Sequence, residues 1–153
     1  MKRRYVFALS ALLALAVAPA HAAILNYTAT LDGAQEVPPV ATPGYGSATI
    51  TIDTTANTLT YSIFFASLIG TETAAHIHGF AGPGVNAGVL HALPAGSPKN
   101  GVWNYAEAQE ANILAGLTYI NVHSTHKAGG EIRGQIVQDT GVPTEPLTWG
   151  QVK

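Results

Sequence analysis

LTYINVHSTHKAGGEIRGQI, residues 117–136, is the stretch that decides the predicted fold. Successive side chains of a β-strand point to opposite faces, so the first half places Tyr119 and His123 on one face and Ile120 and Val122 on the other. The second half alternates in the same way and carries three polar side chains on one face: Glu131, Arg133 and Gln135. A Gly-Gly pair between the halves favours a turn. The stretch therefore predicts two strands, each with an apolar face and a polar face.

The same alternation recurs along the chain. It predicts further strands at residues 24–32, 47–53, 58–67, 74–79 and 89–93. Segments rich in Gly and Pro separate the strands at residues 33–46, 79–88 and 94–101. One helix is expected, with Asn104 as its N-cap, Glu107 at its third position and Gly116 as its end. This order of elements predicts an all-β protein, an antiparallel Greek-key sandwich or barrel with one short helix.

The first 22 residues have the composition of an export signal. Basic residues precede an apolar run, which ends in the small-x-small cleavage pattern AHA at residues 20–22. The apolar run is too short to span a bilayer. We therefore expect a signal peptide at residues 1–22, one β-barrel domain at residues 23–138 and a C-terminal tail at residues 139–153. This organisation predicts a secreted or periplasmic protein with no membrane anchor after signal cleavage.

The composition excludes several classes of function. The chain contains no Cys, so it has no disulfides, thiolate zinc sites, iron–sulfur clusters or cysteine nucleophiles. Charged residues make up 10% of the sequence, the formal net charge is −2, and no cluster of Lys or Arg follows the signal. Nucleic acid is therefore not expected as a partner.

Histidines give the chain its strongest chemical signal. His76 and His78 are spaced as His-x-His, so a strand presents both on one face. A third imidazole from His123 completes a three-nitrogen metal site with an open position. Nitrogen ligands suit copper, which we expect in preference to zinc, and His91 or His126 is the expected fourth ligand. In the alternative interpretation, the imidazoles only form hydrogen bonds that fix loops to the barrel.

Glu131 and Arg133 lie two residues apart on one predicted strand face and allow two interpretations. In the first, they form an ion pair that closes one end of the barrel. In the second, Glu131 orients a metal-bound histidine, and Arg133 attracts an anion such as superoxide. Glu36, beside Pro38 and Pro39, is expected to accept hydrogen bonds that fix its loop.

Three separated motifs resemble the CHRD family, which is named for its occurrence in chordin and is common in secreted bacterial proteins. The motifs are AQEVPP at residues 34–39, AAHIHG at 74–79, and YINVHS with GGEIRGQI within 119–136. The resemblance covers roughly residues 25–137 and implies an extracytoplasmic, immunoglobulin-like β-barrel. In chordin such domains belong to an extracellular binder of growth factors, which implies an extracellular protein as a partner. The motifs contain five of the candidate residues: His76, His78, His123, Glu131 and Arg133. His91 and His126 lie outside the motifs.

The order of the histidines is also similar to that in copper-zinc superoxide dismutase, another Greek-key barrel. The copper ligands of that enzyme run as His-x-His, a later His and a His on a distant strand, and an Arg near the end steers the substrate. His76, His78, His91, His123 and Arg133 follow this order, although the disulfide cysteines and a matching zinc loop are absent. Three functions follow in order of preference: a copper-binding module, a copper-only superoxide dismutase-like enzyme, and a structural or protein-interaction module without metal.

Overall fold

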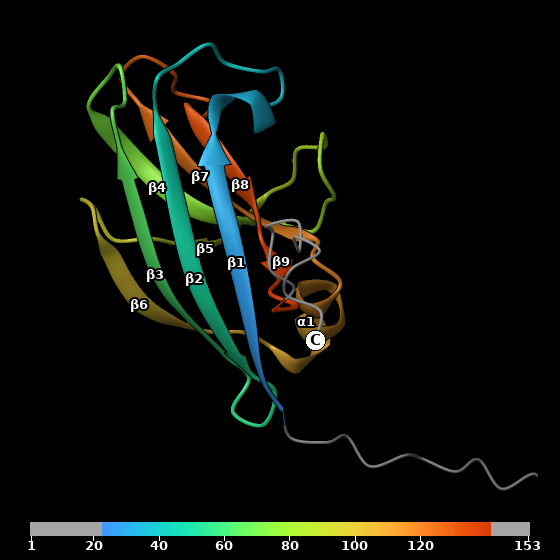
Figure 1. The fold of residues 1–153 in the computed structure, drawn as a ribbon. Helices are drawn as coiled ribbons and strands as arrows, with labels where there is room; N and C mark the ends of the chain where they lie inside the picture. Colours follow the sequence, from blue (N-terminus) through green and yellow to red (C-terminus); the bar gives the residue numbers. More distant parts are fainter. Residues whose placement is uncertain (1–22, 142–153) are drawn as a thin grey trace, which may run out of the picture.

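A computed structural model describes residues 23–141 of the chain (Figure 1). The elements of this part of the chain are, in order, β1 Ile24–Asp32, the 3-10 helix η1 Gly33–Gln35, β2 Tyr45–Asp53, β3 Thr58–Ala66, β4 Glu72–Gly79, β5 Val89–Ala92, β6 Lys99–Asn104, α1 Glu107–Leu114, β7 Thr118–Ser124, β8 Ile132–Gln135 and β9 Val137–Gln138. The predicted all-β class with one short helix is confirmed. The predicted signal peptide, residues 1–22, and residues 142–153 of the predicted tail lie outside the described residues.

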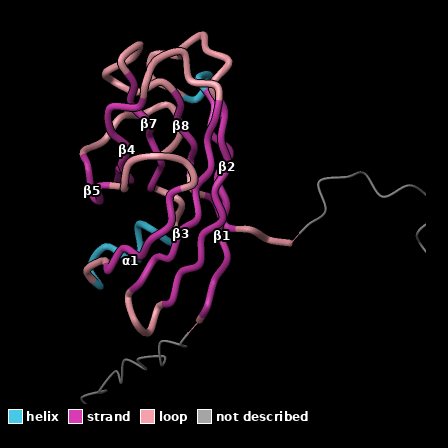
Figure 2. The backbone as a smooth tube through the Cα atoms, turned by 90° about the vertical axis from the view of Figure 1, so that its left-hand side faces the viewer, coloured by secondary structure: helices cyan, strands magenta, loops and turns pink. Residues whose placement is uncertain are grey.

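The strands form one antiparallel sheet that curls into a nearly closed barrel (Figures 1 and 2). Hydrogen-bonded neighbours follow the order β5-β4-β7-β8-β1-β2-β3-β6, and β9 pairs with β1. β5 and β6 are the two ends of this order. Because β4 lies beside β7, the two histidine-bearing segments are neighbours in the sheet, although 47 residues separate His76 from His123.

Alternating apolar side chains fill the interior of the barrel. Ile77 of β4, Ile120 and Val122 of β7 and Ile132 at the start of β8 are all 0% exposed. Complete burial of such a side chain stabilises the fold by roughly 1.5–3 kcal/mol. Because alternate side chains point in opposite directions, burial of Ile77 turns the two flanking histidines away from the core.

The structure confirms the two strands predicted within residues 117–136, as β7 and β8, and adds a strand where a loop was expected. That strand is β6, an end strand of the sheet whose buried side chains are Lys99 and Trp103. Lys99 forms an ion pair with Glu72 of β4 and donates a hydrogen bond to the Pro94 carbonyl at 2.6 Å. A lysine at a core position breaks the apolar alternation in the sequence, which is why the pattern did not indicate a strand.

The helix α1 begins later than predicted. Its N-cap is Ala106, whose N–H donates to Gln109 Oε1 at 2.9 Å, whereas Asn104 belongs to β6. The predicted Asn104 cap is therefore wrong. Gly116 follows the helix with a φ of +72°, a left-handed conformation that favours glycine, so the predicted end is confirmed. Within residues 23–141, no helix has the length and apolar character needed to cross a membrane.

Candidate metal centre

Strand pairing places His76, His78 and His123 on one patch of the sheet, which we call the histidine cluster. In the antiparallel pair of β4 and β7, His76 lies opposite Asn121 and Ala74 lies opposite His123. His76 and His123 are therefore diagonal neighbours across the strand pair, and ring side chains can contact each other over that distance. His78 projects from the same face of β4 as His76. Local strand geometry alone thus gathers three imidazoles from two segments.

The three rings are close enough to share one ion. Each histidine offers a ring nitrogen, and these three atoms all lie within 4.8 Å of one another. The ring centroid of His76 lies 5.0 Å from that of His123 and 5.5 Å from that of His78. Bonds of about 2.0–2.1 Å from a metal to three nitrogens require spacings of roughly 3.5 Å between those nitrogens. One shared ion therefore requires the three nitrogens to lie closer together than this 4.8 Å limit.

Hydrogen bonds decide which nitrogen each ring can offer. His78 Nδ1 lies 3.0 Å from the Ala87 carbonyl, and His123 Nδ1 lies 2.9 Å from the Ala128 carbonyl. A carbonyl only accepts, so in the neutral rings both Nδ1 atoms carry the proton and both Nε2 atoms carry a lone pair. His78 Nε2 is buried and has no hydrogen-bond partner. His123 Nε2 lies 3.1 Å from His76 Nδ1, so it faces into the cluster.

The surroundings keep two of these imidazoles neutral at physiological pH. Burial lowers the pKa of His76, and the neighbouring rings of His123 and His78 lower it further. Burial also lowers the pKa of His78, against the opposing effect of its bond to the Ala87 carbonyl. Neutral imidazole is the form that binds a metal. The histidine cluster therefore has the nitrogen donors, the protonation state and an unpartnered buried atom that a metal site needs.

The two other candidate histidines lie outside this cluster. His91 of β5 stacks on Trp103 of β6 with ring centroids 5.7 Å apart, and its Nε2 lies 3.5 Å from the Tyr61 hydroxyl. His126 is exposed in the turn between β7 and β8. Within residues 23–141, the group that could hold a metal consists of His76, His78 and His123, so the structure brings together three of the five predicted ligands.

Glu131 does not pair with Arg133. The ion pair that the described residues form is Lys99 with Glu72, and the predicted pair of Glu131 with Arg133 is therefore wrong. The Glu131 carboxylate is fully buried and accepts four hydrogen bonds, from the hydroxyls of Thr42 and Ser124 and from the backbone N–H groups of Ile69 and Gly70. Burial alone raises its pKa, but these bonds outweigh burial and lower it. Glu131 thus fixes two distant loops to the barrel, and none of these four hydrogen bonds involves a histidine of the cluster.

Tyr119 is a neighbour of the cluster that the sequence interpretation did not single out. Its ring stacks on that of His78, with ring centroids 5.1 Å apart and an angle of 12° between the ring planes. The guanidinium carbon of Arg133 lies 3.6 Å from the centroid of the Tyr119 ring. The Tyr119 hydroxyl accepts from the Ala87 N–H at 2.9 Å and lies 3.3 Å from the Ala87 carbonyl that also holds His78. The signal was present in the sequence, because Tyr119 shares the predicted strand face of His123.

Together, the fold and the histidine cluster define a class, an antiparallel β-barrel domain with a three-imidazole group that could hold a metal ion. The sequence matches the CHRD domain family over residues 27–136, a range that contains the whole cluster. The chain therefore belongs to the CHRD family. No curated protein and no solved structure matches the chain at a significant level.

Proposed function

We propose that this CHRD domain binds one copper ion through His76, His78 Nε2 and His123 Nε2. The observation that carries the proposal is the direction of the ring nitrogens. His78 and His123 each give the outer nitrogen to a backbone carbonyl, and the inner nitrogens converge with His76. Metal-binding histidines commonly use their second nitrogen in this way. In a purely structural role, the buried Nε2 of His78 would be expected to have a hydrogen-bond partner.

The donor set supports copper over zinc. The cluster offers imidazole nitrogens alone, and the chain has no Cys to supply a thiolate. For such nitrogen sites, the order of divalent affinities places Cu(II) above Zn(II). His76 and His123 are partly exposed, which leaves room for water or another small ligand on a bound ion.

Metal titration of untagged protein tests the proposal. After chelator treatment, the protein should retain about one equivalent of Cu(II) at micromolar concentration and bind Zn(II) more weakly. His78→Ala should weaken copper binding at least 100-fold, while His126→Ala, at an exposed histidine outside the cluster, should leave it unchanged. Failure of the wild-type protein to retain copper, or equal effects of the two substitutions, would contradict the proposal.

A copper-only superoxide dismutase-like activity is the second candidate, and Arg133 is the observation that favours it. Its guanidinium packs on Tyr119, which in turn stacks on His78, so a positive charge lies one ring away from a proposed ligand. Such a charge attracts small anions toward the centre. The test is dismutation by copper-loaded protein, lost on copper removal, restored by copper and absent in His78→Ala. A protein that holds copper without dismutation would leave metal binding as the function.

We infer export through a signal peptide at residues 1–22, a domain at residues 23–138, a tail at residues 139–153 and a secreted or periplasmic location with an extracellular protein partner. Sequencing the N-terminus of the protein recovered from the exported fraction would test the cleavage after Ala22. An unprocessed N-terminus would contradict it.

A Greek-key connection is the finer description that we propose for the fold. β7 lies beside β4, so β4, β5, β6 and the returning β7 have the Greek-key order if β5 adjoins β6. Stacking of His91 on Trp103 across these two strands supports that neighbourhood. In this interpretation His91 is a residue that closes the barrel, and His91→Ala should lower stability without changing copper affinity.

A further inference from the structure

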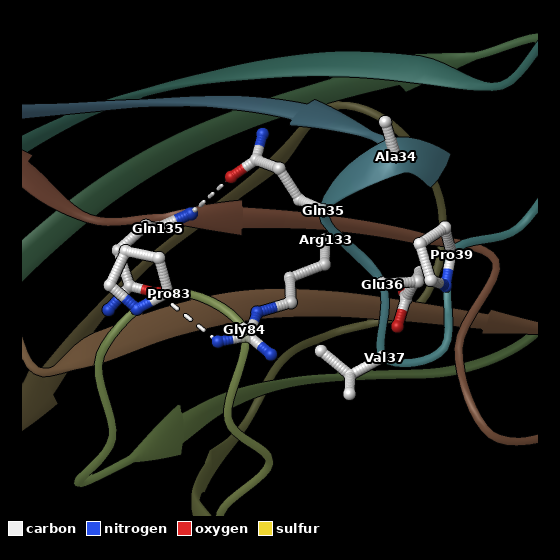
Figure 3. A pocket seen from close by; sticks show the side chains of 9 residues that line it. All are labelled: Ala34, Gln35, Glu36, Val37, Pro39, Pro83, Gly84, Arg133 and Gln135. Atoms are coloured by element: carbon white, nitrogen blue, oxygen red, sulfur yellow. Dashed lines mark hydrogen bonds between the residues drawn. The ribbon is translucent and has the colours of Figure 1, made fainter.

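A cavity lies beside β8, and none of the three clustered histidines lines it (Figure 3). It has a volume of about 420 Å³, which is within the range of small-molecule sites. Its apolar walls come from η1 and from two loops, and they include Ala34, Val37, Pro39 and Pro83. Its polar groups include Arg133 and Glu36, which extend toward the space between the loops in Figure 3.

Arg133 brings a buried positive charge that forms no ion pair with a carboxylate of residues 23–141. Its side chain is 1% exposed, and the ion pair found among residues 23–141 does not involve it. The guanidinium donates to three neutral oxygens, those of Asn86 Oδ1 at 3.4 Å, Gly82 O at 3.3 Å and Gln135 Oε1 at 3.2 Å. A guanidinium has five N–H donors, so donors and charge remain for a ligand.

Glu36 supplies the second polar group of the cavity, and one of its oxygens is unused. The side chain is 5% exposed; Oε2 accepts from Asn121 Nδ2 at 3.3 Å, and the buried Oε1 has no partner. Burial raises the pKa of Glu36 to about 7, against the lowering effects of the Asn121 bond and of Arg133. When protonated, Glu36 can donate a hydrogen bond, and the net charge of the two groups is then +1.

The charged groups around Glu36 come from several elements. Arg133 faces it from β8, and Lys127, in the turn after β7, lines a small hollow of about 150 Å³ on its other side. The neighbour on β7 is the neutral amide of Asn121. Asp32, at the start of η1, uses its carboxylate on Gln35. Apart from Glu36, the charged residues that line the two hollows are Arg133 and Lys127, and their positive charge favours a negatively charged ligand.

We propose that this cavity binds a small organic monocarboxylate with an apolar tail, whose carboxylate contacts Arg133 and Glu36 while its tail packs on the Val37, Pro39 and Pro83 walls. Arginine binds carboxylates through paired N–H donors, and a buried unpaired cation gains most from an anion that excludes water. A neutral ligand would leave the Arg133 charge uncompensated. The inference does not depend on copper, because the cavity and the histidine cluster use different side chains.

Matched ligands and variants test the proposal on chelator-treated full-length protein. Phenylacetate should bind at pH 6, as followed by NMR titration, and its neutral analogue phenylacetamide should bind at least tenfold more weakly. Val37→Trp fills the cavity and should abolish phenylacetate binding, whereas Val102→Trp, the same change at an exposed site on β6, should not. Arg133→Met should weaken binding at least tenfold if the variant folds.

The pH dependence isolates Glu36. Wild-type affinity for phenylacetate should fall severalfold between pH 6 and pH 8, because Glu36 loses its proton and becomes anionic. Glu36→Gln cannot ionise, so its affinity should stay constant across this range. A fall in both proteins of equal size would contradict the assigned role of Glu36.

Two further results would overturn the whole proposal. They are equal affinities for the acid and the amide, and binding that survives Val37→Trp. Copper uptake by Val37→Trp separates this proposal from the proposed function, because the variant should bind copper as the wild type does. A comparison of N-acetylglycylphenylalanine with phenylacetate then distinguishes the carboxylate of a peptide end from that of a free acid.

Discussion

The histidine cluster lies on β4 and β7, and Glu131 directly precedes β8, but the hydrogen bonding of the two sites differs. Glu131 is fully buried, and both of its oxygens accept bonds from loops far away in the sequence. In the cluster, by contrast, the buried Nε2 of His78 has no partner, and the inner nitrogens face one another. A polar group whose bonds are all made holds the fold together, whereas a buried lone pair without a partner, beside two further imidazoles, suits a ligand. Residue type alone does not distinguish these two roles.

Removal of Glu131 should have the largest effect on stability. Glu131→Ala leaves two hydroxyls and two backbone N–H groups without their acceptor, so we expect a loss of about 4 kcal/mol in the free energy of unfolding. Denaturant titration measures it, with Glu107→Ala at an exposed helix position as the matched control. Copper affinity per folded molecule should stay unchanged. A large loss of copper affinity in folded Glu131→Ala would break the comparison, because Glu131 would then act on the cluster.

Glu36 tests an intermediate case, because one of its oxygens is bonded and the other is not. Its pKa rises from 4.5 to about 7 on folding, so its stabilising contribution is fully present below pH 4.5 and is lost as the pH rises through 7. A shift of this size corresponds to about 3 kcal/mol. Between pH 4 and pH 9, wild-type stability should fall by about that amount relative to Glu36→Gln. Denaturant titrations at both pH values measure the difference. Parallel pH profiles of the two proteins would show that Glu36 ionises without a folding-linked shift.

Much of the fold follows from strand alternation in the sequence. β1, Ile24–Asp32, has the predicted bounds, and β7 and β8 lie within the predicted stretch of residues 117–136, because their core faces carry apolar side chains at every second position. β6 was missed because its core position holds Lys99. That lysine is compatible with burial through its ion pair with Glu72, which is 27 residues earlier in the chain. A contact at that separation leaves no mark on the local pattern.

The candidate site shows the same division between local and distant information. The shared face of His76 and His78 follows from their spacing, and strand polarity indicated His123. The role of Glu131 could not be predicted, since its donors at Thr42, Ile69 and Gly70 come from loops that only the folded barrel brings together. The prediction of His91 as a metal ligand rested on the order of histidines in the sequence. Strand pairing instead places His91 opposite Ile77 of β4, and its ring stacks on Trp103. Order along the chain does not specify the face of a strand.

Copper itself should stabilise the protein if the histidine cluster, unlike Glu131, is free to bind a ligand. A ligand that binds only the folded state at 100 times its Kd adds about 2.7 kcal/mol to the free energy of unfolding. Wild-type protein should gain this amount with Cu(II), and His123→Ala should gain almost none. Thermal unfolding with and without copper measures both. A similar gain in His123→Ala would place the bound copper elsewhere on the chain.

Tyr119 should give the smallest change in stability and the sharpest test of how the cluster is positioned. Its hydroxyl bonds to Ala87, whose carbonyl holds His78 Nδ1. Tyr119→Phe should therefore lower stability by about 1 kcal/mol and weaken copper binding roughly tenfold, as loss of a group that orients a ligand does. Tyr27→Phe is the matched control, because it removes a hydroxyl that bonds to the Leu114 carbonyl at 3.0 Å, away from the cluster. Similar stability losses with a change in copper affinity in Tyr119→Phe alone would assign the hydroxyl a positioning role; equal copper affinities would reduce it to a structural contact.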